Sequence, residues 1–118
     1  MKKQKTRIRK TKDKIIVCYI PCSNKKEASS VTEVLLKKRL IACAGFWPVN
    51  SIFFWPPKSR KLVGAREVVI FAKTKKKNFK ALEKEVKKIH SYKVPCIIAW
   101  ELSNINKDYL DWLVSEIK

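Results

Sequence analysis

The chain has 118 residues, of which 46% are hydrophobic, so it fits one globular domain that buries a core without disulfide staples. The 28 Lys plus Arg residues and 10 Asp plus Glu residues give a formal net charge of +18, which suggests nucleic acid or an anionic membrane surface as a partner. No apolar run reaches 18 residues, and the run at residues 15–20 is too short for a secretory signal, so we expect neither a membrane span nor a signal peptide.

The positive charge is concentrated at the start of the chain. Residues 1–14 carry eight basic side chains and one acidic side chain with almost no apolar weight, which predicts a disordered basic arm. Residues 15–118 are expected to form a single domain. Their basic side chains are spread over every predicted helix, which favours a solvated, Lys-rich surface over a dedicated nucleic-acid patch.

The four cysteines also limit the class of protein. Cys18, Cys22, Cys43 and Cys96 form no C-x-x-C pair, and each lies in an apolar or strand-like stretch. This distribution is typical of reduced thiols rather than a disulfide framework, and it predicts a cytoplasmic location.

The first half of the domain is predicted to form a strand, a helix and a second strand. The β-branched and aromatic segment 14–22 predicts a buried central strand. A helix follows from Asn24 to about Leu40, because Asn24 and Glu27 have capping-box spacing and apolar residues then recur at helical intervals. Residues 41–58 predict a long aromatic strand, with a bulge or bend in its middle caused by Gly45 and Pro48.

The second half completes a known order of elements. Residues 61–74 predict an antiparallel partner for the preceding strand, joined to it by three or four residues. An amphipathic helix at 75–90, a fourth strand at 95–102 and a C-terminal helix at 106–117 follow. The order βαββαβ with a final helix predicts an α+β ferredoxin-like fold, in which two helices cover one face of a four-stranded sheet.

The aromatic hairpin has more apolar surface than one small domain can bury. Its members are Phe46, Trp47, Phe53, Phe54 and Trp55. Because exposed patches of this kind mark subunit interfaces, we expect an oligomer.

Several motifs, in order, resemble the CutA family of divalent-cation tolerance proteins. They are "PCSN" at 21–24, "RLIAC" at 39–43, "SIFFW" at 51–55, "EVVIFAKT" at 67–74, "HSYKVPCIIA" at 90–99 and "DYLDW" at 108–112. The resemblance implies a homotrimer of ferredoxin-like subunits, with the long hairpin reaching a neighbour, and a role in tolerance of copper and other divalent ions. It also implies similarity to PII signalling proteins, which bind small effectors between subunits.

The sequence departs from the family pattern at several positions. Cys96 stands where the family has an acidic residue, Ser91 and Glu101 each replace a proline, and Pro57-Lys58 replaces Gly-Lys at the end of the hairpin. A thiol in place of a carboxylate favours a softer metal site.

The single histidine, His90, has two interpretations. At the end of a predicted helix it can act as a C-terminal cap that interacts with the last carbonyl groups. Alternatively, it is a metal ligand together with a thiolate from Cys96 or Cys22, and such a site selects copper or zinc over Mg or Ca. Cys22 matches the family's cysteine and is the better thiol, whereas Cys18 and Cys43 are expected in the core. No third ligand is visible in the sequence.

Four further residues fall in family motifs near the expected cleft between subunits. Lys73, Tyr92, Lys58 and Trp55 are either amphipathic interface and strand-end residues, or the binding site of an anionic effector. One histidine with scattered acidic residues gives no acid–base pair and no nucleophilic triad, so we do not expect an enzyme.

We therefore expect a cytoplasmic, CutA-like homotrimer that binds divalent or soft metal ions, copper first, and contributes to metal tolerance. One alternative is a PII-like sensor of small molecules. A second is a basic nucleic-acid module, because RNA-binding domains share this order of elements. The aromatic RNP pattern of those domains is missing from residues 15–20 and 67–74, so nucleic acid is the less favoured partner.

Overall fold

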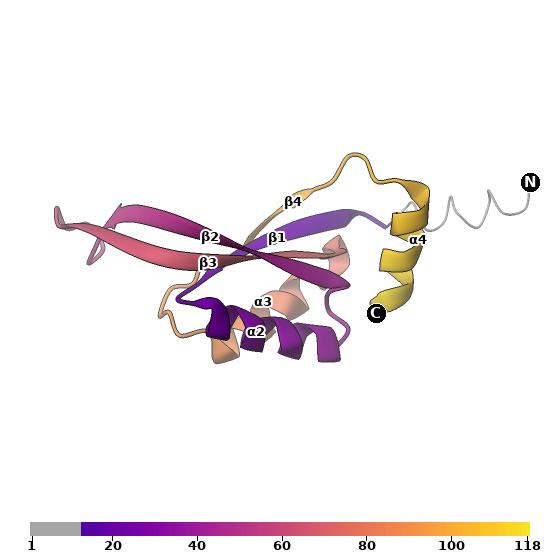
Figure 1. Ribbon diagram of the computed structural model, residues 1–118, viewed down its shortest axis with the longest axis horizontal. Coiled ribbons are helices and arrows are strands. Elements are labelled where there is room, and N and C mark those ends of the chain that lie inside the picture. Colours follow the sequence, from indigo (N-terminus) through magenta and orange to yellow (C-terminus); the bar gives the residue numbers. More distant parts are fainter. Residues whose placement is uncertain (1–12) are drawn as a thin grey trace, which may run out of the picture.

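The computed structural model describes residues 13–118, and residues 1–12 of the predicted arm lie outside this range. The chain forms β1 (Ile15–Cys22), α2 (Lys25–Lys37), β2 (Cys43–Phe54), β3 (Leu62–Lys75), the short 3-10 helix η1 (Lys76–Asn78), α3 (Phe79–Ile89), β4 (Ile98–Glu101) and α4 (Lys107–Glu116) (Figure 1). The predicted order of elements is confirmed.

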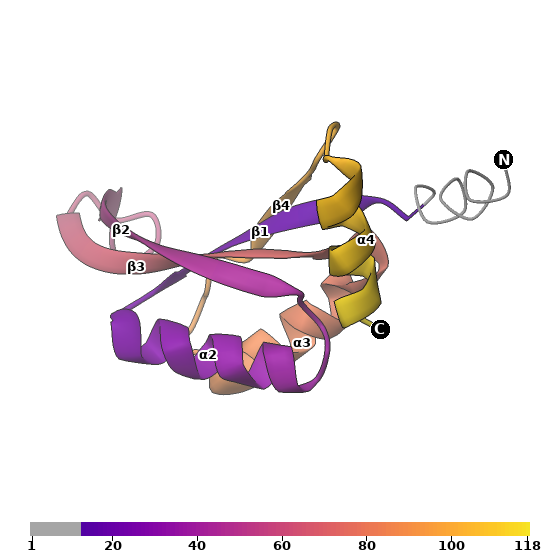
Figure 2. The same cartoon turned by 45° about the vertical axis from the view of Figure 1, so that its right-hand side comes forward.

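The four strands form one antiparallel sheet in the order β2-β3-β1-β4. In the central pair, β1 and β3, the register runs from Ile15 opposite Lys75 to Cys22 opposite Val68. Helices α2 and α3 lie together on one face of the sheet, and α4 lies at one end (Figure 2). This is the predicted α+β ferredoxin-like arrangement with an added C-terminal helix.

The core lies between the sheet and the two helices, because alternate residues of β1 point to one face. Cys18 and Ile20 on this face are fully buried, as are Leu35 of α2 and Leu82 of α3. A second, smaller cluster, made up of Ile15, Ala42, Leu113 and Ile117, attaches α4 to the end of the sheet.

A bulge or a bend was predicted in the middle of β2, and the bulge is absent. The β2–β3 ladder runs without interruption from Cys43 opposite Lys73 to Phe54 opposite Leu62. Because β2 is an edge strand, Pro48 can lie in the ladder with its nitrogen toward the unpaired side.

The turn of the hairpin is longer than predicted and occupies residues 55–61 rather than three or four residues. The Trp55 N–H donates to the carbonyl oxygen of Lys61 at 3.0 Å, so the two chains stay paired past the ladder. Lys58 has a positive φ of 67°, which lets the turn close.

Three element boundaries also differ from the predictions. α2 ends at Lys37 rather than near Leu40, because Arg39 adopts a positive φ of 58° and returns Leu40 to the core. α3 begins at Phe79 rather than residue 75, because β3 continues to Lys75 and stays paired with Ile15. The fourth strand begins at Ile98 rather than at residue 95.

The face of the sheet opposite α2 and α3 is aromatic. Tyr19 and Phe71 meet edge to face with centroids 5.6 Å apart, and Phe71 meets Trp100 in the same way at 6.5 Å. Within residues 13–118, α4 covers only the end of this face, where Tyr109 contacts Lys73. Trp100 is 46% exposed, and Trp47 on the neighbouring β2 is 63% exposed.

The hairpin makes the domain elongated. The described residues extend over 61 × 26 × 22 Å, and the β2–β3 end of the hairpin projects beyond all other elements (Figure 1). Among the helices of residues 13–118, none combines the length and the apolar character that crossing a bilayer requires.

Candidate metal centre

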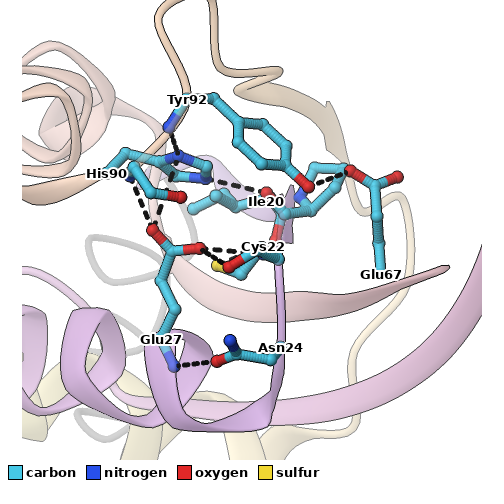
Figure 3. Close-up of polar contacts among 10 residues, drawn as sticks. Ile20, Cys22, Asn24, Glu27, Glu67, His90 and Tyr92 are labelled. Carbon is cyan, nitrogen blue, oxygen red and sulfur yellow. Dashed lines mark hydrogen bonds and ion pairs between the residues drawn. The ribbon is translucent and has the colours of Figure 1, made fainter. Parts of the chain in front are cut away.

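Three potential metal ligands from distant parts of the sequence meet at one end of the central strand. They are Cys22 at the end of β1, Glu27 in the first turn of α2 and His90 directly after α3 (Figure 3). One ligand atom from each side chain lies within 4.8 Å of the other two. The fold thus brings together a thiol, a carboxylate and an imidazole.

The turn between β1 and α2 holds the carboxylate of Glu27 in place. The side-chain oxygen of Asn24 accepts from the backbone N–H of Glu27 at 2.8 Å, as the capping-box spacing predicts. The Glu27 carboxylate accepts from the backbone N–H and the hydroxyl of Ser23 at 2.8 and 2.9 Å. Ser23, rather than Asn24, therefore completes the cap.

Both ring nitrogens of His90 have partners. Nε2 lies 2.8 Å from the carbonyl oxygen of Pro21 in β1, and Nδ1 lies 3.0 Å from the backbone N–H of Tyr92. A carbonyl oxygen only accepts and an amide N–H only donates, so these partners assign a neutral imidazole with its proton on Nε2. The side chain of His90 is completely buried.

The predicted capping role of His90 is only partly right. Its backbone N–H donates to Val86 at 2.9 Å and ends α3, but its imidazole contacts β1 instead of the last carbonyl groups of α3. The ring therefore joins α3 to the sheet.

The carboxylate of Glu27 is ionised. Burial acts to raise its pKa, but hydrogen bonds from Ser23 and Ser91 outweigh burial and lower the pKa to about 2. The Ser91 N–H donates to Glu27 Oε2 at 2.6 Å, and this oxygen lies 3.8 Å from Nδ1 of His90. A negative charge therefore lies beside the unprotonated ring nitrogen.

The thiol of Cys22 is fully buried and protonated. Burial raises its pKa to about 12, and the negative charges of Glu27 and Glu67 act in the same direction. A cation that bound here would have to displace the thiol proton, which is the usual requirement for a cysteine ligand.

A second network adjoins the three ligands. The Tyr92 hydroxyl donates to one oxygen of Glu67 at 2.7 Å, and the Ser51 hydroxyl donates to the other at 2.6 Å. Burial and the hydrogen bond to Glu67 raise the pKa of Tyr92, which keeps the phenol a donor. The ring centroids of Tyr92 and His90 lie 4.7 Å apart, so the phenol held by Glu67 packs against the imidazole.

The other predicted site residues lie elsewhere in the subunit. Cys96 is exposed and is not a member of the three-ligand cluster, although it is close to His90 in sequence. Lys73 donates to the Tyr109 hydroxyl at 3.2 Å and lies 3.7 Å from the sulfur of Cys43, at the opposite end of β3.

Trp55 and Lys58 lie in the turn of the hairpin. At about 3.3 Å per residue, Lys73 is roughly 20 Å along β3 from Glu67, the partner of Tyr92. One subunit therefore does not gather the four predicted cleft residues in one place.

Sequence reasoning missed Glu27 as a third potential ligand. Its spacing from Asn24 was fully explained by helix capping, and the Asn24 side chain does accept from the Glu27 N–H at the start of α2. The only sign of a second role was its distance of five residues from Cys22 across a strand-to-helix turn, which brings both side chains to the same end of β1.

Known proteins resemble this chain over nearly its whole length. The sequence pattern of the family described as CutA1 divalent ion tolerance protein matches residues 16–116. The divalent-cation tolerance protein CutA of Archaeoglobus fulgidus is 36% identical over 95 residues, which cover 80% of this chain and 90% of that protein. The CutA protein of Pyrococcus horikoshii is 34% identical over 104 residues, which cover 88% of this chain and 99% of that protein.

Solved structures of CutA proteins also resemble the structure of this chain. The structure described as the periplasmic divalent cation tolerance protein CutA of Archaeoglobus fulgidus matches with a TM-score of 0.83 at 33% identity, over 88% of this chain and 99% of that chain. CutA1 of Oryza sativa matches with a TM-score of 0.84 at 28% identity, over 90% of this chain and 95% of that chain. The resemblance seen in the motifs is thus confirmed, and the chain belongs to the CutA1 divalent ion tolerance protein family.

Proposed function

We propose that this protein binds a divalent or soft metal ion through Cys22, Glu27 and His90, and that this binding underlies its part in metal-ion tolerance. The observation that carries the proposal is the convergence of the three ligand atoms within 4.8 Å. Copper is the first candidate and zinc the second, because imidazole and thiolate suit both ions and a carboxylate also suits zinc.

Glu27 supplies a fixed negative charge that favours a cation at this position. Nδ1 of His90 is the unprotonated ring nitrogen, and to bind the ion it would exchange the hydrogen bond from the Tyr92 N–H for the metal bond. Nε2–H donates to Pro21, which orients the ring and increases the basicity of Nδ1 in the way that outer-shell partners do at metal sites. In this proposal the thiol ligand is Cys22 rather than Cys96, because Cys96 lies outside the cluster.

The experiment is a calorimetric titration of the full chain with Zn(II), and with Cu(I) under reducing conditions. Cys22→Ser, Glu27→Gln and His90→Gln should each weaken binding by at least about 10- to 100-fold, which is the loss known for the outer-shell partners of metal ligands. Cys96→Ser is the matched control, because it removes a thiol outside the cluster and should leave the affinity unchanged. Equal affinity in wild type and Cys22→Ser would contradict the proposal.

The proposal includes assembly into a homotrimer. It is supported by the aromatic face on which Tyr19 and Phe71 are partly buried and Trp100 is exposed, and by the projecting hairpin, which exposes Phe54 and Trp55. Sedimentation at micromolar concentration should give three times the mass of the 13.8 kDa chain, and a monomer would contradict this part.

An effector cleft built from Lys73, Tyr92, Lys58 and Trp55 requires more than one copy, because these residues are spread along the hairpin and sheet of one subunit. The PII-like alternative therefore depends on the trimer. We also propose a cytoplasmic, non-catalytic protein, and the four free thiols support this location.

A further inference from the structure

A cavity separate from the three metal ligands lies where the hairpin leaves the sheet. It has a volume of about 460 Å³ and lies between the start of α2 and the base of the hairpin. The lining residues are Ser23, Asn24, Lys25, Pro48, Val49, Asn50, Arg66, Glu67 and Val68. Its volume falls within the range of about 300 to 1,000 Å³ that is usual for small-molecule sites.

The cavity exists because the strands differ in length. The β1–β3 ladder ends at Cys22 opposite Val68, whereas the β2–β3 ladder continues for six more pairs, from Glu67 to Leu62. After Cys22 the chain turns away into α2, so no strand covers the hairpin next to Arg66.

Strand alternation decides which side chains face this space. Val68 packs against the core below the helices, so Arg66 shares this helix-side face, together with its cross-strand partner Asn50. Glu67 points to the opposite face, where its carboxylate accepts from the Tyr92 hydroxyl (Figure 3) and from the Ser51 hydroxyl. The only acidic lining residue therefore directs its charge away from the cavity.

The two cationic lining residues are available to a ligand. Among residues 13–118, Lys25 and Arg66 form no ion pair, although ten pairs involve other residues. The amide group of Asn24 uses its oxygen to cap α2, which leaves its N–H₂ group as a donor. Pro48 and Val68 add an apolar wall.

We propose that this cavity is a binding site for a small organic anion, a molecule that carries a phosphate or carboxylate group and a short apolar portion. The Arg66 guanidinium can bind two oxygens of such a group at once, and Lys25 adds a point charge from the other wall. Asn24 and Asn50 supply neutral hydrogen-bonding groups, and the apolar portion lies against Pro48 and Val68. This site does not depend on the metal-binding function.

The test measures binding of pyrophosphate and of citrate to the full chain by calorimetry at constant ionic strength. Each matched pair of variants removes the same charge inside or outside the cavity: Lys25→Gln against Lys26→Gln, and Arg66→Gln against Arg60→Gln. The first member of each pair should weaken binding at least tenfold, and the second by less than twofold. Pyrophosphate bound more tightly than citrate would identify phosphate as the preferred group, and the reverse order would identify carboxylate.

Two results would overturn the proposal. One is the lack of saturable binding of either anion at millimolar concentration. The other is equal weakening in all four variants, which would show general attraction to a chain of formal net charge +18. His90→Gln should leave anion binding unchanged, so failure of the metal site and failure of the anion site are distinguishable.

Discussion

The imidazole of His90 and the carbonyl group of Pro21 are joined by a hydrogen bond of 2.8 Å, which fixes the end of α3 against the end of β1. The same ring accepts from Tyr92 through its other nitrogen. One buried side chain therefore orients the thiol-bearing end of β1 and the segment that follows α3.

Replacing His90 by alanine should destabilise the fold. The change leaves the Pro21 carbonyl group and the Tyr92 N–H without their partner, and a buried unsatisfied group costs about 1 to 3 kcal/mol. We expect a loss of about 2 to 4 kcal/mol in urea unfolding. The exposed Lys84→Ala on the same helix is the control and should change stability by less than about 0.5 kcal/mol. A loss for His90→Ala as small as the control's would show that these bonds contribute little.

Glu27 should make stability depend on acid pH. Its pKa falls from 4.5 to about 2 on folding, so its contribution is fully present above pH 4.5 and is lost as the pH falls toward 2. At neutral pH, Glu27→Gln should be less stable than wild type by on the order of 2 to 3 kcal/mol. The difference between the two unfolding curves should shrink steadily between pH 4.5 and 2, and a constant difference would contradict the assignment.

Metal binding should release a proton from the Cys22 thiol. Because burial raises the pKa of this thiol to about 12, it is protonated at pH 7 and must ionise to bind the ion. Affinity should therefore rise about tenfold per pH unit between pH 7 and 9. Calorimetry in buffers with different ionisation enthalpies should give about one proton released per ion. Release that is unchanged in Cys22→Ser would assign the proton to another group.

Tyr92→Phe should lower the stability of the fold without weakening metal binding. The variant loses the 2.7 Å bond to Glu67 but keeps the backbone N–H that binds His90. We expect about 1 to 2 kcal/mol less stability and a metal affinity within twofold of wild type. A large loss of affinity would instead place the phenol itself at the ion.

The sequence was sufficient for the order of elements, because buried strands and amphipathic helices have strong periodic patterns. It also singled out His90 and Cys22, which the fold brings into one cluster of potential ligands. It was insufficient for choosing between Cys22 and Cys96. Cys96 is nearer to His90 in sequence, but the chain after His90 leads it out to an exposed position, while the end of β1 returns to the histidine. The position of Glu27 beside His90 and Cys22 was missed because helix capping alone explains its spacing from Asn24. The bulge at Pro48 was predicted from the local residues alone, which do not show that β2 is an edge strand.

The unequal lengths of the β1–β3 and β2–β3 ladders also affect the stability of the hairpin. Beyond Cys22 the β2–β3 pair is a two-stranded ribbon whose outer edges have no partner strand among residues 13–118, and such a ribbon is marginally stable in water. In the proposed homotrimer, neighbouring copies would stabilise the ribbon, so its folding would depend on protein concentration. Amide hydrogen exchange at Ile52 and Val63 should slow as the protein is concentrated, while exchange at Ile20 in the central strand should not change.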